Sequence, residues 1–113
     1  MKRRTPHFPL ALVKGLAALP DGLFIQRTRA VDFFTSHAEA YAAARRVIEG
    51  PTESDFSETL RLTHDVADVY GVRIEDVGWY LKMTVDETVP EVAVISSHPL
   101  ERPIRTNGGT VEP

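Results

Sequence analysis

Several side chains that could carry acid–base or phosphate chemistry lie in the second half of the chain. They are Glu58, Arg61, Arg73, Tyr80, Lys82 and His98. A carboxylate and an imidazole have reference pKa values of about 4.3 and 6.5, so together they supply a base and an acid near neutral pH. A guanidinium matches the geometry of a phosphate group. These residue types therefore suit chemistry on a phosphodiester, provided that the fold brings them together.

Four strands are expected to position these side chains. The stretches rich in β-branched and aromatic residues are 56–63, 67–74, 78–86 and 91–97, with acidic or glycine-bearing turns between them. Because the connections are short, consecutive strands should be antiparallel neighbours in a meander. Strict alternation puts Tyr80 and Lys82 together on the polar face of their strand.

The first half of the chain is expected to be mainly helical. Residues 9–19 carry apolar side chains at helical spacing, and residues 37–49 combine high helix propensity with a serine cap and a terminating Gly-Pro pair. A short strand at 23–28 and a short helical segment at 29–34 are expected between them. These helices should back the sheet and leave its other face as the working surface.

Composition indicates one domain. A chain of 113 residues that is 42% hydrophobic can build one core, which we place in residues 1–98. The segment 99–113 has no periodic apolar pattern, and we expect it to be disordered or to act as a docking tail. No apolar run approaches the ~20 residues of a membrane span, and no secretory signal is convincing.

Charge and cysteine content narrow the chemistry. The chain has no cysteine, which excludes thiolate chemistry and fits a cytoplasmic protein, and a zinc site would have to be built from His and carboxylates alone. The net charge of −3 argues against a protein that binds nucleic acid through overall positive charge. Local clusters of charge must therefore decide what the protein binds.

Five short motifs together resemble one known family. They are residues 4–7 (RTPH), 12–14 (LVK), 53–56 (ESDF), 68–70 (DVY) and 80–84 (YLKMT). In this order and spacing they are similar to the MqsR family of bacterial toxins, over about residues 2–98. The resemblance implies an α+β fold like that of the RelE toxins, with N-terminal helices packed on an antiparallel sheet of about four to five strands. It also implies a metal-independent ribonuclease that cleaves mRNA, and a partner antitoxin that binds zinc and DNA.

The chain departs from the family pattern at several polar positions. Glu58 stands where the family has a lysine, Ala67 replaces a glutamine, and His98 corresponds to another lysine. Tyr80 keeps the family residue, and Arg73 occupies a position where the family also has an arginine. We interpret the changes as the exchange of a lysine-based site for a carboxylate and imidazole pair.

That interpretation assigns a role to each candidate residue. Metal-free cleavage of RNA needs a base for the 2′-hydroxyl, an acid for the leaving 5′-oxygen and cations for the phosphorane. We assign Glu58 as the base, His98 as the acid, and Arg73 and Lys82 as the stabilising cations. Tyr80 would contact a base or a phosphate. The products would be a 2′,3′-cyclic phosphate and a 5′-hydroxyl.

The surroundings expected for Glu58 favour this role. Strict alternation gives Glu58 the same face as Phe56, Leu60 and Leu62, so its carboxylate should be partly desolvated. The alternative is an ordinary salt bridge to Arg61 or Lys82 at the margin of the sheet. Arg61 is also the second choice for binding phosphate or RNA.

Two other classes of function remain open. The acidic balance and the substituted positions also suit a toxin-fold binding protein that pairs with an antitoxin, in transcriptional control or as a decoy, without cutting RNA. The third class is an α+β domain that resembles the toxins only through common ancestry. Toxicity on expression, relieved by an antitoxin, separates the first reading from the other two.

Overall fold

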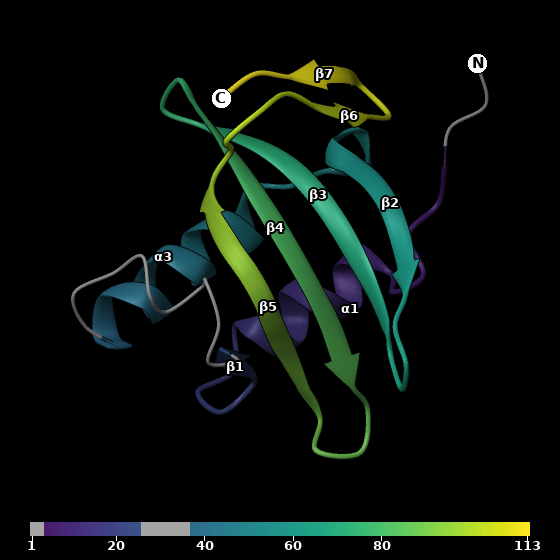
Figure 1. Cartoon of the computed structure of the whole chain (residues 1–113). Helices are drawn as coiled ribbons and strands as arrows, with labels where there is room; N and C mark the ends of the chain where they lie inside the picture. Colours follow the sequence, from purple (N-terminus) through teal and green to yellow (C-terminus); the bar gives the residue numbers. More distant parts are fainter. Residues whose placement is uncertain (1–3, 26–36) are drawn as a thin grey trace.

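The computed structural model describes residues 4–25 and 37–113, which form an α+β fold (Figure 1). The helices are α1 (Leu10–Ala17), α3 (His37–Glu49) and a short 3-10 turn, η1 (Glu53–Asp55). The strands of the main sheet are β1 (Leu23–Ile25), β2 (Phe56–Arg61), β3 (Val66–Ile74), β4 (Val77–Asp86) and β5 (Glu91–Pro99). A C-terminal hairpin adds β6 (Ile104–Thr106) and β7 (Gly109–Val111).

The main sheet has five strands in the order β1-β5-β4-β3-β2. The predicted meander of four antiparallel strands from β2 to β5 is confirmed. The prediction of a wholly antiparallel sheet is wrong, because β1 pairs in parallel with β5 through Leu23 and Val92. Short connections predict the pairing of consecutive strands only. The chain between β1 and β5 includes α3 and the strands β2 to β4, so their pairing could not be predicted in this way.

Both helices lie against one face of the sheet, which we call the helix face (Figure 1). Val13 and Ala17 of α1 and Val47 and Ile48 of α3 are buried in the core. The helix predicted at 37–49 is observed with those bounds, and the one predicted at 9–19 is two turns long, Leu10–Ala17. The helices do not form a single N-terminal block, since β1 lies between them. The predicted helical segment 29–34 lies outside the described residues.

A buried carboxylate holds the start of the chain against the helix face. Asp68 is fully buried and accepts hydrogen bonds from the backbone N–H groups of His7 at 3.1 Å and Phe8 at 2.8 Å. It also accepts one from the Thr59 hydroxyl at 2.6 Å. Three donors satisfy the charge in the core, so Asp68 has a structural role.

The segment 99–113, predicted to be disordered or to act as a docking tail, is folded and packs on the sheet, so the disordered alternative is wrong. It begins as the end of β5 and continues into the β6–β7 hairpin, which lies over the face of the sheet opposite the helices (Figure 1). We call this second face the open face. The hairpin packs on Gly71, where an added Cβ would collide with Ile104. Such a short hairpin has no periodic apolar pattern of its own, because its support comes from the sheet beneath it.

Candidate functional site

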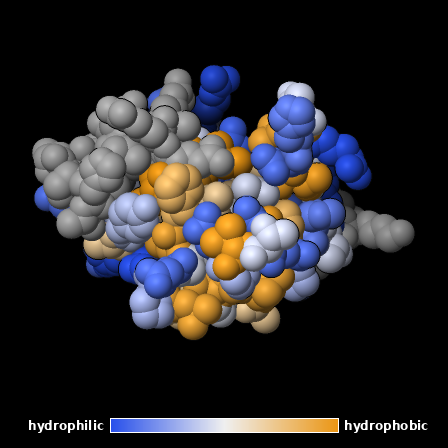
Figure 2. Space-filling view, turned by 90° about the horizontal axis from the view of Figure 1, so that it is seen from below, coloured by the Kyte–Doolittle hydropathy of each residue, from blue (hydrophilic) through white to orange (hydrophobic). Residues whose placement is uncertain are grey.

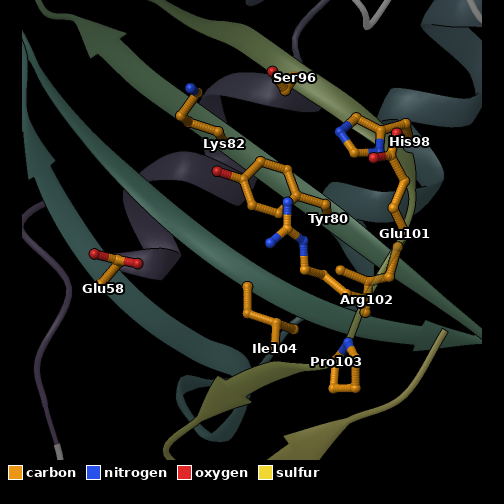
Figure 3. Close-up of a pocket in the computed structure, with 10 residues that line it drawn as sticks. Glu58, Tyr80, Lys82, Ser96, His98, Glu101, Arg102, Pro103 and Ile104 are labelled. Carbon is orange, nitrogen blue, oxygen red and sulfur yellow. The ribbon is translucent and has the colours of Figure 1, made fainter.

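The open face carries a cavity of about 480 Å³ beside the C-terminal hairpin (Figure 3). Its polar lining includes Glu58 from β2, Tyr80 and Lys82 from β4, and Ser96 and His98 from β5. Glu101, Arg102, Pro103 and Ile104 close one side. Four of the six predicted site residues therefore share one cavity, which we call the open-face cavity.

Strand register explains why these side chains meet. One row across β2 to β5 contains Glu58, Val69, Lys82 and Ser96. The next row contains Gly71, Tyr80 and His98. Residues two apart on a strand point to the same face, so both rows project onto the open face. The absence of a side chain on Gly71 leaves room there for the hairpin that walls the cavity.

Glu58 reaches this face because of a β-bulge. The register of β2 against β3 shifts between Phe56, which pairs with Tyr70, and Glu58, which pairs with Val69. Phe56 consequently points into the core, whereas Glu58 is exposed on the open face. The prediction that Glu58 shares the face of Phe56 and is partly desolvated is wrong, since strict alternation fails at a bulge.

His98 and Tyr80 are stacked neighbours across β4 and β5. Their ring centroids are 5.2 Å apart and the ring planes differ by 15°. The Nδ1 atom of His98 lies 2.8 Å from the carbonyl oxygen of Pro99, which can only accept, so Nδ1 carries a proton. This bond favours the tautomer with the proton on Nδ1 and leaves Nε2 as the ring nitrogen available to a ligand.

The phenol of Tyr80 remains protonated at neutral pH. Partial burial, and secondly the negative charge of Glu58, raise the pKa of Tyr80 above its ordinary value. A protonated phenol is a hydrogen-bond donor, which suits contact with an anionic group.

The two predicted arginines do not line the open-face cavity. Arg73, at the far end of β3, donates to the carbonyl oxygens of Asp76 at 3.3 Å and Glu112 at 3.4 Å. Arg61, at the end of β2, lines a separate cavity together with His64. The sequence predicts the strand on which each arginine lies. It does not predict how far either arginine lies from His98, because that distance depends on the C-terminal hairpin and on the length of β3.

Arg102 is the functional candidate that the sequence did not reveal. It lines the open-face cavity from a segment that was expected to be unstructured. Figure 3 shows its side chain extending from the C-terminal segment toward Tyr80, while Glu58 lies on the opposite side. No motif marks Arg102, and the resemblance ends before it.

A second cavity, of about 530 Å³, lies near the turn between β4 and β5 and differs in charge. Four carboxylates line it, those of Asp65, Asp86, Glu87 and Glu91. Seen from that end, hydrophobic and hydrophilic residues are interspersed on the surface (Figure 2). Such a cavity would repel a phosphate, so the open-face cavity is the better site for an anionic ligand.

Residues 4–25 and 37–113 contain no cluster of three or more side chains suited to hold a metal ion. None of the helices described has the length and hydrophobicity to cross a bilayer.

Geometry thus defines an α+β protein with a mixed-charge cavity on one face of its sheet. No protein-family model matches the sequence, and no curated protein matches it significantly. The likeness to MqsR toxins therefore rests on the five motifs alone.

Proposed function

We propose that this protein is an MqsR-like toxin of a type II toxin–antitoxin system, a metal-independent endoribonuclease that cleaves single-stranded mRNA in the cytoplasm and inhibits translation. The observation that carries the proposal is the meeting of Glu58, Tyr80, Lys82 and His98 around one cavity. They come from three strands and supply a base, donors, a cation and an acid. The antitoxin, of the zinc- and DNA-binding kind, would silence the enzyme.

In the proposed reaction, one proton transfer takes place on each side of the scissile phosphate. The Glu58 carboxylate takes the proton of the 2′-hydroxyl, and the 2′-oxygen forms a bond to phosphorus. The bond from phosphorus to the 5′-oxygen breaks, and the Nε2–H of the His98 imidazolium gives its proton to that oxygen. The products are a 2′,3′-cyclic phosphate and a free 5′-hydroxyl.

The position of each group suits in-line displacement, in which nucleophile and leaving group lie on opposite sides of phosphorus. Glu58 and His98 lie on β2 and β5, with β3 and β4 between them. Three spacings of about 4.8 Å separate those strands by about 14 Å at the backbone. Both side chains must then reach inward, which leaves a phosphate between them and over the middle of the sheet.

Lys82 and Tyr80 occupy that middle region on β4. Lys82 is half-buried in the row that begins with Glu58, and Tyr80 lies in the next row beside His98. An ammonium group and a protonated phenol there would donate to the non-bridging phosphate oxygens as negative charge develops. Tyr80 could also stack on a base, as aromatic side chains do in RNA sites.

The test is cleavage of ribosome-free mRNA in excess EDTA. We expect the wild type to cut, and Glu58→Gln and His98→Ala each to lose at least about 100-fold in rate, as for an acid–base group. Glu87→Gln and His64→Ala are matched controls, because these exposed residues lie outside the open-face cavity. Circular dichroism must show that all five proteins are folded.

Two results would contradict the proposal in different ways. If the wild type leaves RNA intact with and without ribosomes, the enzyme assignment fails. The protein would then fit the alternative of an antitoxin-binding toxin fold, which the exposure of Glu58 already favours. If the wild type cuts but the site variants and the controls retain equal activity, cleavage occurs elsewhere and the residue assignments fail.

A further inference from the structure

The C-terminal segment, residues 99–113, is attached to the sheet at several points near the cavity. The Leu100 N–H donates to the Gly78 carbonyl at 2.8 Å, which joins the segment to β4, and the Leu100 side chain is buried. Gly78 has room for no side chain, since an added Cβ would collide with the Glu112 carbonyl. The segment is thereby fixed directly before and directly after the hairpin.

A second set of bonds holds the hairpin turn. The N–H groups of Asn107 and Gly108 donate to the carbonyls of Phe56 at 2.9 Å and Ser54 at 2.7 Å. The Asn107 side chain donates to Arg4 O at 2.7 Å and Glu53 O at 3.0 Å. Residues 100–104 therefore form a fixed wall of the open-face cavity.

Charge in the cavity is balanced, so each cation matters. Its lining contains two carboxylates, Glu58 and Glu101, and two cations, Lys82 and Arg102. Without Arg102, two carboxylates would face Lys82 and the His98 imidazolium of the proposed reaction, and the cavity would attract an anion less strongly. Arg73 cannot compensate, because its guanidinium is bonded to backbone carbonyls away from the cavity.

Arg102 is well placed to bind an anion. Its side chain is exposed and extends into the cavity toward Tyr80 (Figure 3). Within residues 4–25 and 37–113, no hydrogen bond or ion pair engages its guanidinium. A guanidinium binds phosphate oxygens with two parallel N–H donors, and the fixed backbone removes the cost of ordering the segment.

We propose that the C-terminal segment is part of the substrate site, and that Arg102 binds a backbone phosphate of single-stranded RNA over Tyr80 and Lys82. This inference rests on the proposed function and deepens it. Arg102 takes the phosphate-binding role that the sequence assigned to Arg73. The segment thus adds a guanidinium to the one ammonium group, that of Lys82, with which the sheet lines the cavity.

The test is binding of a fluorescent single-stranded RNA that is 2′-O-methylated throughout and so cannot be cut. Anisotropy should show that Arg102→Gln weakens binding by about tenfold or more, as for a charge-assisted hydrogen bond. Arg105→Gln is the matched control, because Arg105 is exposed on β6 of the same hairpin and does not line the cavity. It should change the Kd less than about twofold.

Salt dependence separates a direct contact from a change in overall charge. Loss of one phosphate contact should reduce the slope of log K against log salt by about 0.7 for a single strand, in Arg102→Gln only. Arg102→Lys keeps the charge but not the paired donors, so it should recover only part of the affinity. Equal losses in Arg102→Gln and Arg105→Gln would overturn the inference, while cleavage by the wild type would still support the function. A wild type that neither binds this RNA nor cuts mRNA would overturn both.

Discussion

The two faces of the sheet are built from the same strands but differ in what their polar groups do. On the helix face, Asp68 and Tyr70 are fully buried, and the Asp68 carboxylate accepts three hydrogen bonds from groups within the protein. On the open face, Glu58 and Arg102 are exposed and border a cavity. Asp68 on the first face stabilises the fold, whereas the polar groups on the second face remain available to a ligand.

This difference arises from one-residue alternation along each strand. On β3 and β4, Tyr70 pairs with Leu81 inside the core, while the neighbouring pair, Gly71 and Tyr80, belongs to the open face. Substitution of a residue on the helix face should therefore change stability, and substitution of its neighbour on the open face should change activity. A result in which one substitution changed both properties would argue against this separation.

The largest effect should come from Asp68→Ala. Removing the carboxylate leaves the N–H groups of His7 and Phe8 without their acceptor and should lower the free energy of unfolding by about 3 kcal/mol or more. Asp65→Ala, at an exposed position before β3, should change it by less than about 0.5 kcal/mol. Urea denaturation measures both. A loss below about 1 kcal/mol in Asp68→Ala would show that Asp68 does not anchor the chain start.

A matched pair of Tyr→Phe substitutions tests the two faces directly. Tyr80→Phe should reduce RNA cleavage by about tenfold through the loss of one donor to a charged group, with little change in stability. Tyr70→Phe should leave cleavage unchanged. Its hydroxyl is buried with no hydrogen-bond partner in the described part of the chain, so removing it should stabilise the protein by about 1 kcal/mol. The reverse pattern would contradict the division between the faces.

The smallest effect should appear at alkaline pH. Burial, followed by the charges of Asp68, Glu53 and Asp55, raises the pKa of Tyr70 well above its ordinary value. Above about pH 10 the unfolded chain loses this phenolic proton while the folded chain keeps it, so stability should fall as pH rises. Urea midpoints between pH 9 and 11 should decline more steeply in the wild type than in Tyr70→Phe. Parallel curves would show that Tyr70 does not cause the decline.

Much of the fold could be predicted because it depends on local pattern. The order of strands β2 to β5 follows from their alternation and short turns, and α3 from its propensity and terminating glycine. The shared position of Tyr80 and Lys82 on the open face also follows from alternation along β4. These features need only residues that are close in sequence.

The remainder depends on contacts that sequence pattern does not encode. The bulge before Glu58 reverses the face of one residue, and nothing in the composition of β2 marks it. The parallel pairing of β1 with β5 joins strands far apart in the chain. Arg102 reaches the cavity only because Gly71 and Gly78 leave space for the C-terminal segment. Each of these features is set by tertiary packing rather than by local preference.

Asn107 also determines when the site can exist during protein synthesis. Its side chain and the backbone of Arg4 bond to each other across 103 positions of the chain. A nascent chain in which β2 to β5 have emerged from the ribosome still lacks the wall bearing Arg102 until Asn107 has emerged as well. In a chain made from its N-terminus, the wall bearing Arg102 can therefore form only after the strands that carry the other residues of the open-face cavity.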